Sequence, residues 1–143
     1  MNKKYDFSQI SASWYFCFNH NCPLHEGCLR YQSALELPAN VQRGNAIYPH
    51  ACQANGCSFF RADQPVVLVT GFVNSKNPAM NQAFVALRHR IENVTGSGGS
   101  YYLYRNGKRW LSPQQQEQIR QIFAKEGYPT PTYDHSKEGY DFT

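Results

Sequence analysis

Apolar residues along the chain fall into a few short runs, separated by polar stretches that are rich in turn residues. Residues 65–73 form an unbroken run dominated by β-branched side chains, which predicts a buried strand. Asn77 and Pro78 are the residue types of a helix N-cap and of a first helical position, so we expect a helix to begin there. Its apolar residues recur every three or four positions and predict one buried stripe: Phe84, Leu87, Ile91 and Val94.

The stretch after this helix contains a hairpin signal. Asn106-Gly107 separates two aromatic and basic runs, and this dipeptide is the strongest short signal for a two-residue hairpin turn. It predicts a β-hairpin that pairs residues 101–105 with residues 108–111, with aromatic side chains buried on its faces.

A second helix signal follows directly. Ser112 is a suitable N-cap, Pro113 suits the first helical position, and Gln115 completes a capping box. Gly127 is suited to end this helix. The expected buried stripe is narrow and consists of Ile119, Ile122 and Phe123.

The N-terminal part is less regular. Residues 5–18 are aromatic and predict an extended segment, and residues 29–37 predict a helix that Pro38 ends. Residues 129–143 mix Pro, Thr, Asp and Gly, so we expect a loosely attached tail. The pattern as a whole predicts an α+β fold. We expect one small domain over residues 1–128, with a short sheet, two to three helices and a Cys-rich N-terminal segment held by a metal.

Composition adds a constraint on the core. The chain has 143 residues, the size of one ordinary domain, but Leu, Ile, Val and Phe together make up only about a fifth of it. We therefore expect a thin core that a metal or covalent crosslink would stabilise. The sequence contains no apolar run of transmembrane length and no apolar segment of a secretory signal near its start, which predicts a cytoplasmic protein without a membrane partner.

The candidate chemistry lies in five cysteines within 41 residues. In a reducing compartment such a pattern favours metal or redox chemistry over disulfides, and an odd count would leave one thiol unpaired in any disulfide scheme. Four thiolates close a tetrahedral zinc site. The spacing has four, five, 23 and four residues between successive cysteines: Cys17, Cys22, Cys28, Cys52 and Cys57.

The identity of the metal stays open between two groups. Zinc is favoured, because the spacing lacks the tight run of cysteines that is typical of iron–sulfur proteins. An iron–sulfur cluster is the alternative, because Cys22-Pro23 matches the proline that follows a ligand in ferredoxin-type motifs.

Several stretches of the chain resemble a family of small, uncharacterised, cysteine-rich proteins of Bacteroidetes. The resemblance implies a shared metal-binding quartet of Cys17, Cys22, Cys28 and Cys57, and it implies no activity. Cys52 departs from it. The stretches that carry the resemblance are Cys17-Phe18-Asn19, Cys22-Pro23, Cys28-Leu29-Arg30-Tyr31, Cys57-x2-Phe60-Arg61 and residues 101–116.

Three further residues are alternative ligands. His20 and His25 lie inside the cysteine-rich loop and would either replace a sulfur or hydrogen-bond one, although surface loop histidines are the more common case. Cys52 lies five residues before Cys57, close enough to join the site. We expect Cys52 to pack without a redox role, as an unpaired thiol usually does.

Charge suggests a second function. Residues 74–125 carry eight basic and two acidic residues, a net charge of +6, which suits a nucleic acid. The more common alternatives are that the basic residues form an ordinary solvated surface and that the aromatic residues belong to the core. The candidate nucleic-acid-binding residues are Arg88, Arg90, Tyr104, Arg105, Lys108 and Arg109.

The sequence contains no recognisable catalytic motif, so we expect a metal-binding protein rather than an enzyme. The preferred hypothesis is a small intracellular protein with structural zinc that acts as a binding or interaction module. The alternatives are an iron–sulfur or thiol redox sensor and a small nucleic-acid-binding regulator. The partner would be a protein or a nucleic acid.

Overall fold

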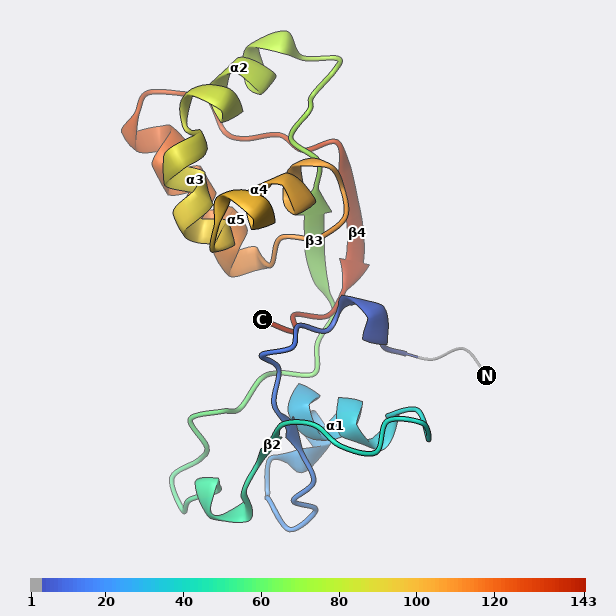
Figure 1. Cartoon of the computed structure of the whole chain (residues 1–143). Coiled ribbons are helices and arrows are strands. Elements are labelled where there is room, and N and C mark those ends of the chain that lie inside the picture. Colours follow the sequence, from blue (N-terminus) through green and yellow to red (C-terminus); the bar gives the residue numbers. More distant parts are fainter. Residues whose placement is uncertain (1–3) are drawn as a thin grey trace. The chain divides into compact units, whose positions relative to one another are not determined.

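The chain forms helices and short strands in the computed structural model, which describes residues 4–143 (Figure 1). The fold class is α+β, as predicted. The described residues divide into two compact units. The N-terminal unit runs to Pro65 and includes Phe142 and Thr143, and the C-terminal unit is Val66–Asp141. No helix in the described part of the chain is long and apolar enough to cross a membrane.

The C-terminal unit packs four helices against a two-stranded antiparallel sheet. Strand β3 (Val66–Thr70) pairs with β4 (His135–Gly139). Hydrophobic side chains from β3 and from all four helices form the core, and Ile91, Ile119 and Phe123 are fully buried. The helices are α2 (Pro78–Ala86), α3 (Arg88–Thr95), α4 (Gly98–Arg105) and α5 (Pro113–Lys125).

Two helix predictions are confirmed in this unit. The Asn77 side chain accepts a hydrogen bond from the Met80 amide, 3.2 Å away, at the start of α2. Ser112 and Gln115 form the predicted capping box of α5. The first predicted helix is divided into α2 and α3 at Leu87, whose backbone leaves the helical region.

The predicted β-hairpin is wrong, because residues 98–105 form helix α4. Tyr101 and Tyr104 are three positions apart and therefore share the buried face of that helix. Gly107 has a φ of +78°. Its amide and the Lys108 amide donate back to the carbonyls of Tyr104 and Leu103, which is the Schellman helix ending. A left-handed glycine serves this ending as well as a hairpin turn, so Asn-Gly alone could not separate the two.

The expected loose tail also differs from the structure. Residues 135–139 form β4 along the full length of β3, and Phe142 is buried in the N-terminal unit. Just before β4, the Asp134 carboxylate accepts hydrogen bonds from the amides of Val73 and Asn74. Backbone pairing and this carboxylate attach a segment whose polar composition gave no strand signal.

Gly71 is the tightest point of that attachment. Its φ is +90°, and a Cβ atom placed on it would lie 2.7 Å from the Asp134 Cβ atom. We expect Gly71→Ala to lower the free energy of unfolding of the C-terminal unit by about 2 kcal/mol or more, from backbone strain and the clash. Gly96→Ala is the matched control, because its φ is +101° and an added Cβ would meet nothing within 4 Å. If thermal denaturation shows the same loss of stability in Gly71→Ala and Gly96→Ala, the result would contradict a contribution from the clash with Asp134.

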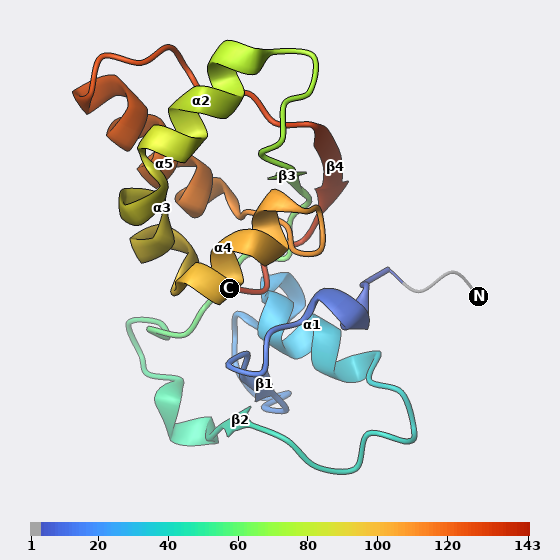
Figure 2. The same cartoon turned by 45° about the horizontal axis from the view of Figure 1, so that its top comes forward.

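The N-terminal unit has little regular structure. Strands β1 (Phe16–Cys17) and β2 (Ala46–Ile47) form one short parallel pair, and α1 (Leu29–Leu35) is the predicted helix, two residues shorter than expected (Figure 2). Most of the unit is loops and single 3₁₀ turns. Such a unit buries little apolar surface, and its core is small: Tyr5, Trp14, Leu29, Ala34 and Phe142 are its largest buried apolar residues beside Cys28.

Candidate metal centre

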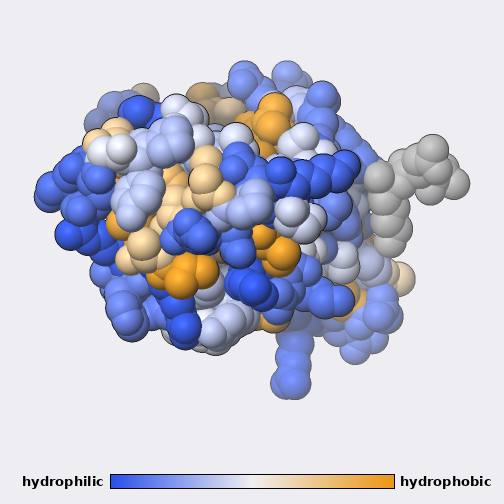
Figure 3. All heavy atoms as spheres, turned by 90° about the horizontal axis from the view of Figure 1, so that it is seen from above, coloured by the Kyte–Doolittle hydropathy of each residue, from blue (hydrophilic) through white to orange (hydrophobic). Residues whose placement is uncertain are grey.

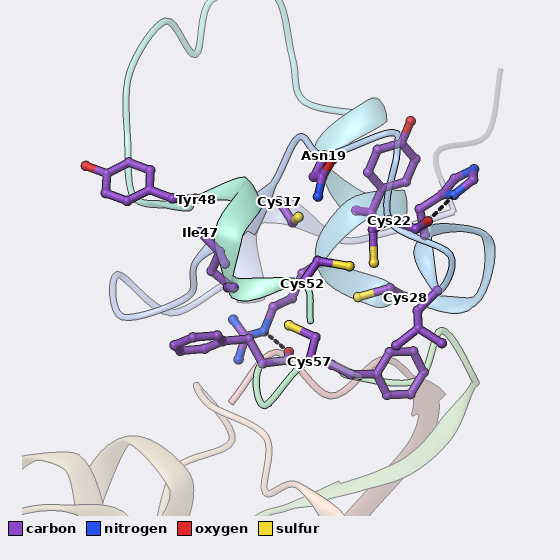
Figure 4. Close-up of a pocket in the computed structure, with 15 residues that line it drawn as sticks. Cys17, Asn19, Cys22, Cys28, Ile47, Tyr48, Cys52 and Cys57 are labelled. Atoms are coloured by element: carbon purple, nitrogen blue, oxygen red, sulfur yellow. Dashed lines mark hydrogen bonds between the residues drawn. The ribbon is translucent and has the colours of Figure 1, made fainter. Parts of the chain in front are cut away.

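One pocket in the N-terminal unit brings all five cysteines together. Its remaining lining comes from the cysteine loop, α1 and the segments around residues 47–60. In Figure 4 the side chains of Cys22, Cys28 and Cys52 point toward one another, with Cys17 and Cys57 at the border of the same space. Residues as far apart as positions 17 and 57 therefore converge on one site.

Backbone pairing places the first two thiols. Cys17 is the last residue of β1, where the parallel register sets it opposite Ile47 of β2. Cys22 lies in the following loop, where its amide donates to the Asn19 carbonyl over 3.2 Å. The Asn19 side chain in turn donates to the Pro49 carbonyl. The loop of Cys22 is thereby attached to the segment that carries Cys52.

Cys28 is the most buried of the five thiols, with 9% of its surface exposed. It is the N-cap residue of α1 and pairs through an isolated β-bridge with Ala62, five residues after Cys57. The next amide, that of Leu29, donates to the Arg61 carbonyl over 2.6 Å. These bonds bring the start of α1 beside the segment that follows Cys57.

A tight turn links the last two thiols. Cys52 ends the 3₁₀ helix Pro49–Ala51, and the backbone groups of Gln53 and Gly56 exchange two hydrogen bonds of 2.9 and 3.0 Å. Gly56 has a φ of +121°, which favours glycine at this point. The turn directs both Cys52 and Cys57 to the same pocket.

The thiols lie near one another but do not form a finished coordination shell. Among the described residues, no three Cys, His, Asp or Glu side chains are arranged to hold a metal ion as they stand. Burial raises the pKa of the Cys17 thiol. A hydrogen bond with the Cys22 thiol, more than burial, raises the pKa of Cys52. A metal ion would therefore have to displace protons and draw the sulfur atoms together.

A buried arginine lies against this cluster. The Arg30 side chain donates from Nε to the Phe59 carbonyl over 2.6 Å and from Nη1 to the Tyr15 carbonyl over 3.0 Å. Its guanidinium lies 4.1 Å from the centre of the Trp14 ring. Burial lowers the pKa of Arg30, while the nearby cysteines oppose that shift. No carboxylate in the described part of the chain forms an ion pair with it.

Sequence reasoning did not assign this role to Arg30. The available signal was its place in the predicted helix 29–37, beside Leu29 and on the side that also carries Ser33 and Ala34. All four of these residues are buried. A charged residue on the buried side of a short helix indicates a nearby counter-charge or a set of buried acceptors.

The two candidate histidines differ in position. His25 lines the pocket, with Nδ1 2.7 Å from the Cys22 carbonyl oxygen and the ring edge-on to Tyr31. His20 is exposed and does not line the pocket. His25 thus hydrogen-bonds the backbone of a candidate ligand, as a residue just outside a coordination shell does.

The candidate nucleic-acid residues differ in burial and in their partners. Tyr104 is buried, Arg88 pairs with Glu92, and Arg90 pairs with Glu126. The other three candidates lie at the end of α4 and in the loop behind it: Arg105, Lys108 and Arg109. The face of the molecule in Figure 3 carries hydrophobic residues in small groups among hydrophilic ones.

Comparison with known proteins gives a family and no activity. No curated protein and no solved structure matches the chain. The model of a family of unknown function, DUF6078, matches residues 1–142. The chain therefore belongs to the DUF6078 family over essentially its whole length.

Proposed function

We propose that the N-terminal unit binds one zinc ion through cysteine thiolates, and that this ion is structural. The observation that carries the proposal is the convergence of five cysteines on one pocket, from β1, the loop after it, the start of α1 and the turn between positions 52 and 57. Cysteines that serve only as small apolar residues have no reason to share one site. Four thiolates at one point are the preferred ligand set of structural zinc.

The charge of Arg30 supports the same assignment. A buried guanidinium without a carboxylate partner is costly unless another anion compensates it. A zinc ion with four thiolates carries a net charge of −2. Three of the cysteines lie close enough to Arg30 to influence it, in the opposite sense to the neighbouring Arg61. Zinc binding would thus give the buried arginine a counter-charge.

The small core of the N-terminal unit supports a structural role for the metal. Among its described residues, the N-terminal unit has one two-residue strand pair and one α-helix of seven residues. A structural zinc site supplies folding free energy directly, as in small domains that are unfolded without metal. Metal binding would therefore replace the apolar burial that this unit lacks.

The surface near the pocket suits an interaction module rather than an enzyme. Phe18, Tyr48 and Phe59 belong to the N-terminal unit and expose 58%, 70% and 43% of their surface. Exposed aromatic residues are enriched at protein interfaces. We propose that the metal holds the loops that present these side chains.

Single cysteine substitutions test the proposal. We expect purified protein to carry about one zinc per chain, and Cys22→Ser or Cys28→Ser to reduce this to near zero because a tetrahedral shell loses a ligand. His20→Ala is the matched control outside the pocket and should retain the metal. Metal content is measured by mass spectrometry of the folded monomer, together with a visible spectrum under anaerobic conditions.

Each other outcome has a definite meaning. Visible absorption with stoichiometric iron would replace zinc by an iron–sulfur cluster at the same thiols. Metal-free wild-type protein that remains folded would contradict the proposal. Metal that persists in both cysteine variants would contradict the assignment of these two ligands.

A further inference from the structure

The pocket contains one thiol more than a zinc ion uses. Structural zinc takes four ligands, whereas five cysteines line the site. If the metal is held by four of them, as proposed above, the fifth thiol lies directly beside bound thiolates. A free thiol in that position is unlike a buried, inert cysteine, because its neighbours are nucleophilic sulfur atoms.

We take Cys52 as the spare thiol because of its place in the chain. Cys17 lies in strand β1 and Cys28 is buried at the start of α1, whereas Cys52 is partly exposed in an irregular segment held by short turns. Cys22 and Cys52 both line the pocket. Figure 4 shows these two side chains pointing toward one another. A disulfide between them requires only that two sulfur atoms facing the same pocket come together.

We propose that Cys52 is an oxidation site, and that it forms a disulfide with Cys22 which releases the metal. The proposal rests on the zinc site proposed above. Hydrogen peroxide oxidises the Cys52 sulfur to a sulfenic acid and is itself reduced, with loss of one water. The Cys22 sulfur then attacks the Cys52 sulfur, the S–O bond breaks, and the hydroxyl group leaves as a second water after taking up a proton.

The disulfide releases the metal because it removes Cys22 from the ligand set. One peroxide accepts the two electrons that the thiol pair gives up, so each disulfide removes one ligand and also consumes the spare thiol. Three thiols remain, Cys17, Cys28 and Cys57, and these cannot close a four-coordinate shell. Reduction of the disulfide by a thiol reductant would restore the site.

The test treats zinc-loaded full-length protein with one equivalent of hydrogen peroxide. We expect zinc release, followed with a chromogenic chelator, to match the amount of Cys22–Cys52 disulfide found by peptide mapping. Cys52→Ser should retain the metal and release it at least about tenfold more slowly.

Three results would overturn the inference: a Cys52 disulfide with another cysteine, unchanged release from Cys52→Ser, or loss of metal from untreated Cys52→Ser. The last would make Cys52 a ligand. Wild-type protein without metal before peroxide contradicts the zinc proposal instead. Peptide mapping of that metal-free protein still decides whether Cys22 and Cys52 are the reactive pair.

Discussion

Removal of the metal is expected to unfold the N-terminal unit while the C-terminal unit stays folded. Structural zinc contributes an apparent binding free energy of about 10–16 kcal/mol in small zinc domains, an amount comparable with what the few buried apolar residues of this unit supply. The C-terminal unit contains its own core, with Phe84, Ile91 and Phe123 fully buried. Hydrogen exchange of the full chain, with and without a strong chelator, measures each unit separately.

The expected result is a loss of amide protection in α1 and retained protection in α5. α1 is the sensitive probe because Cys28 is its N-cap and the Gln32 amide donates to the Cys28 carbonyl. α5 is the internal control, since its stripe packs in the C-terminal core. Protection of α1 that does not change on complete removal of the metal would contradict a structural role.

Replacement of Arg30 is expected to have the second largest effect. Arg30→Met keeps much of the side-chain length but leaves the carbonyls of Phe59 and Tyr15 without their donor. Each unsatisfied buried carbonyl costs about 1–3 kcal/mol, so we expect the N-terminal unit to lose about 3 kcal/mol of stability. Loss of the counter-charge should weaken zinc binding about 10–100-fold, as for other groups that support metal ligands.

Two companion variants separate charge from hydrogen bonding. Arg43→Met removes a positive charge from an exposed loop of the same unit and should change neither property. Arg30→Lys keeps the charge but loses the planar arrangement of donors, so it should recover part of the zinc affinity while stability stays low. Competition titration with a zinc chelator measures affinity, and denaturant unfolding measures stability. Equal zinc affinity in Arg30→Met and wild type would contradict the counter-charge role.

The parts of the fold that local chemistry determines could be predicted from the sequence. The capping box at Ser112, the strand after Pro65 and the buried stripe of α3 each depend on residues within one turn or one strand. The hairpin prediction failed because Asn-Gly is compatible with both a hairpin and a Schellman ending, and the burial of Tyr104 against the core decided between them. Strand β4 depends on pairing with β3, 65 or more positions away, which its own composition does not signal.

The candidate site could likewise be predicted only where local sequence determines it. The cysteine pattern indicated which residues to examine, and all five lie at one pocket. The sequence could not show that Cys52 faces Cys22 in the pocket, because this arrangement depends on the loop that Asn19 attaches to Pro49. Nor could it show that Arg30 reaches the carbonyls of two other segments. Both features arise from long-range packing of irregular loops, where no periodic pattern exists.

X-ray absorption at the zinc edge tests the central claim most directly, because it reports the atoms bound to the metal in the intact protein. The account predicts about one zinc per chain with four sulfur neighbours at about 2.3 Å. A shell made only of nitrogen and oxygen atoms near about 2.0 Å would place any bound zinc away from the cysteines and would contradict the account.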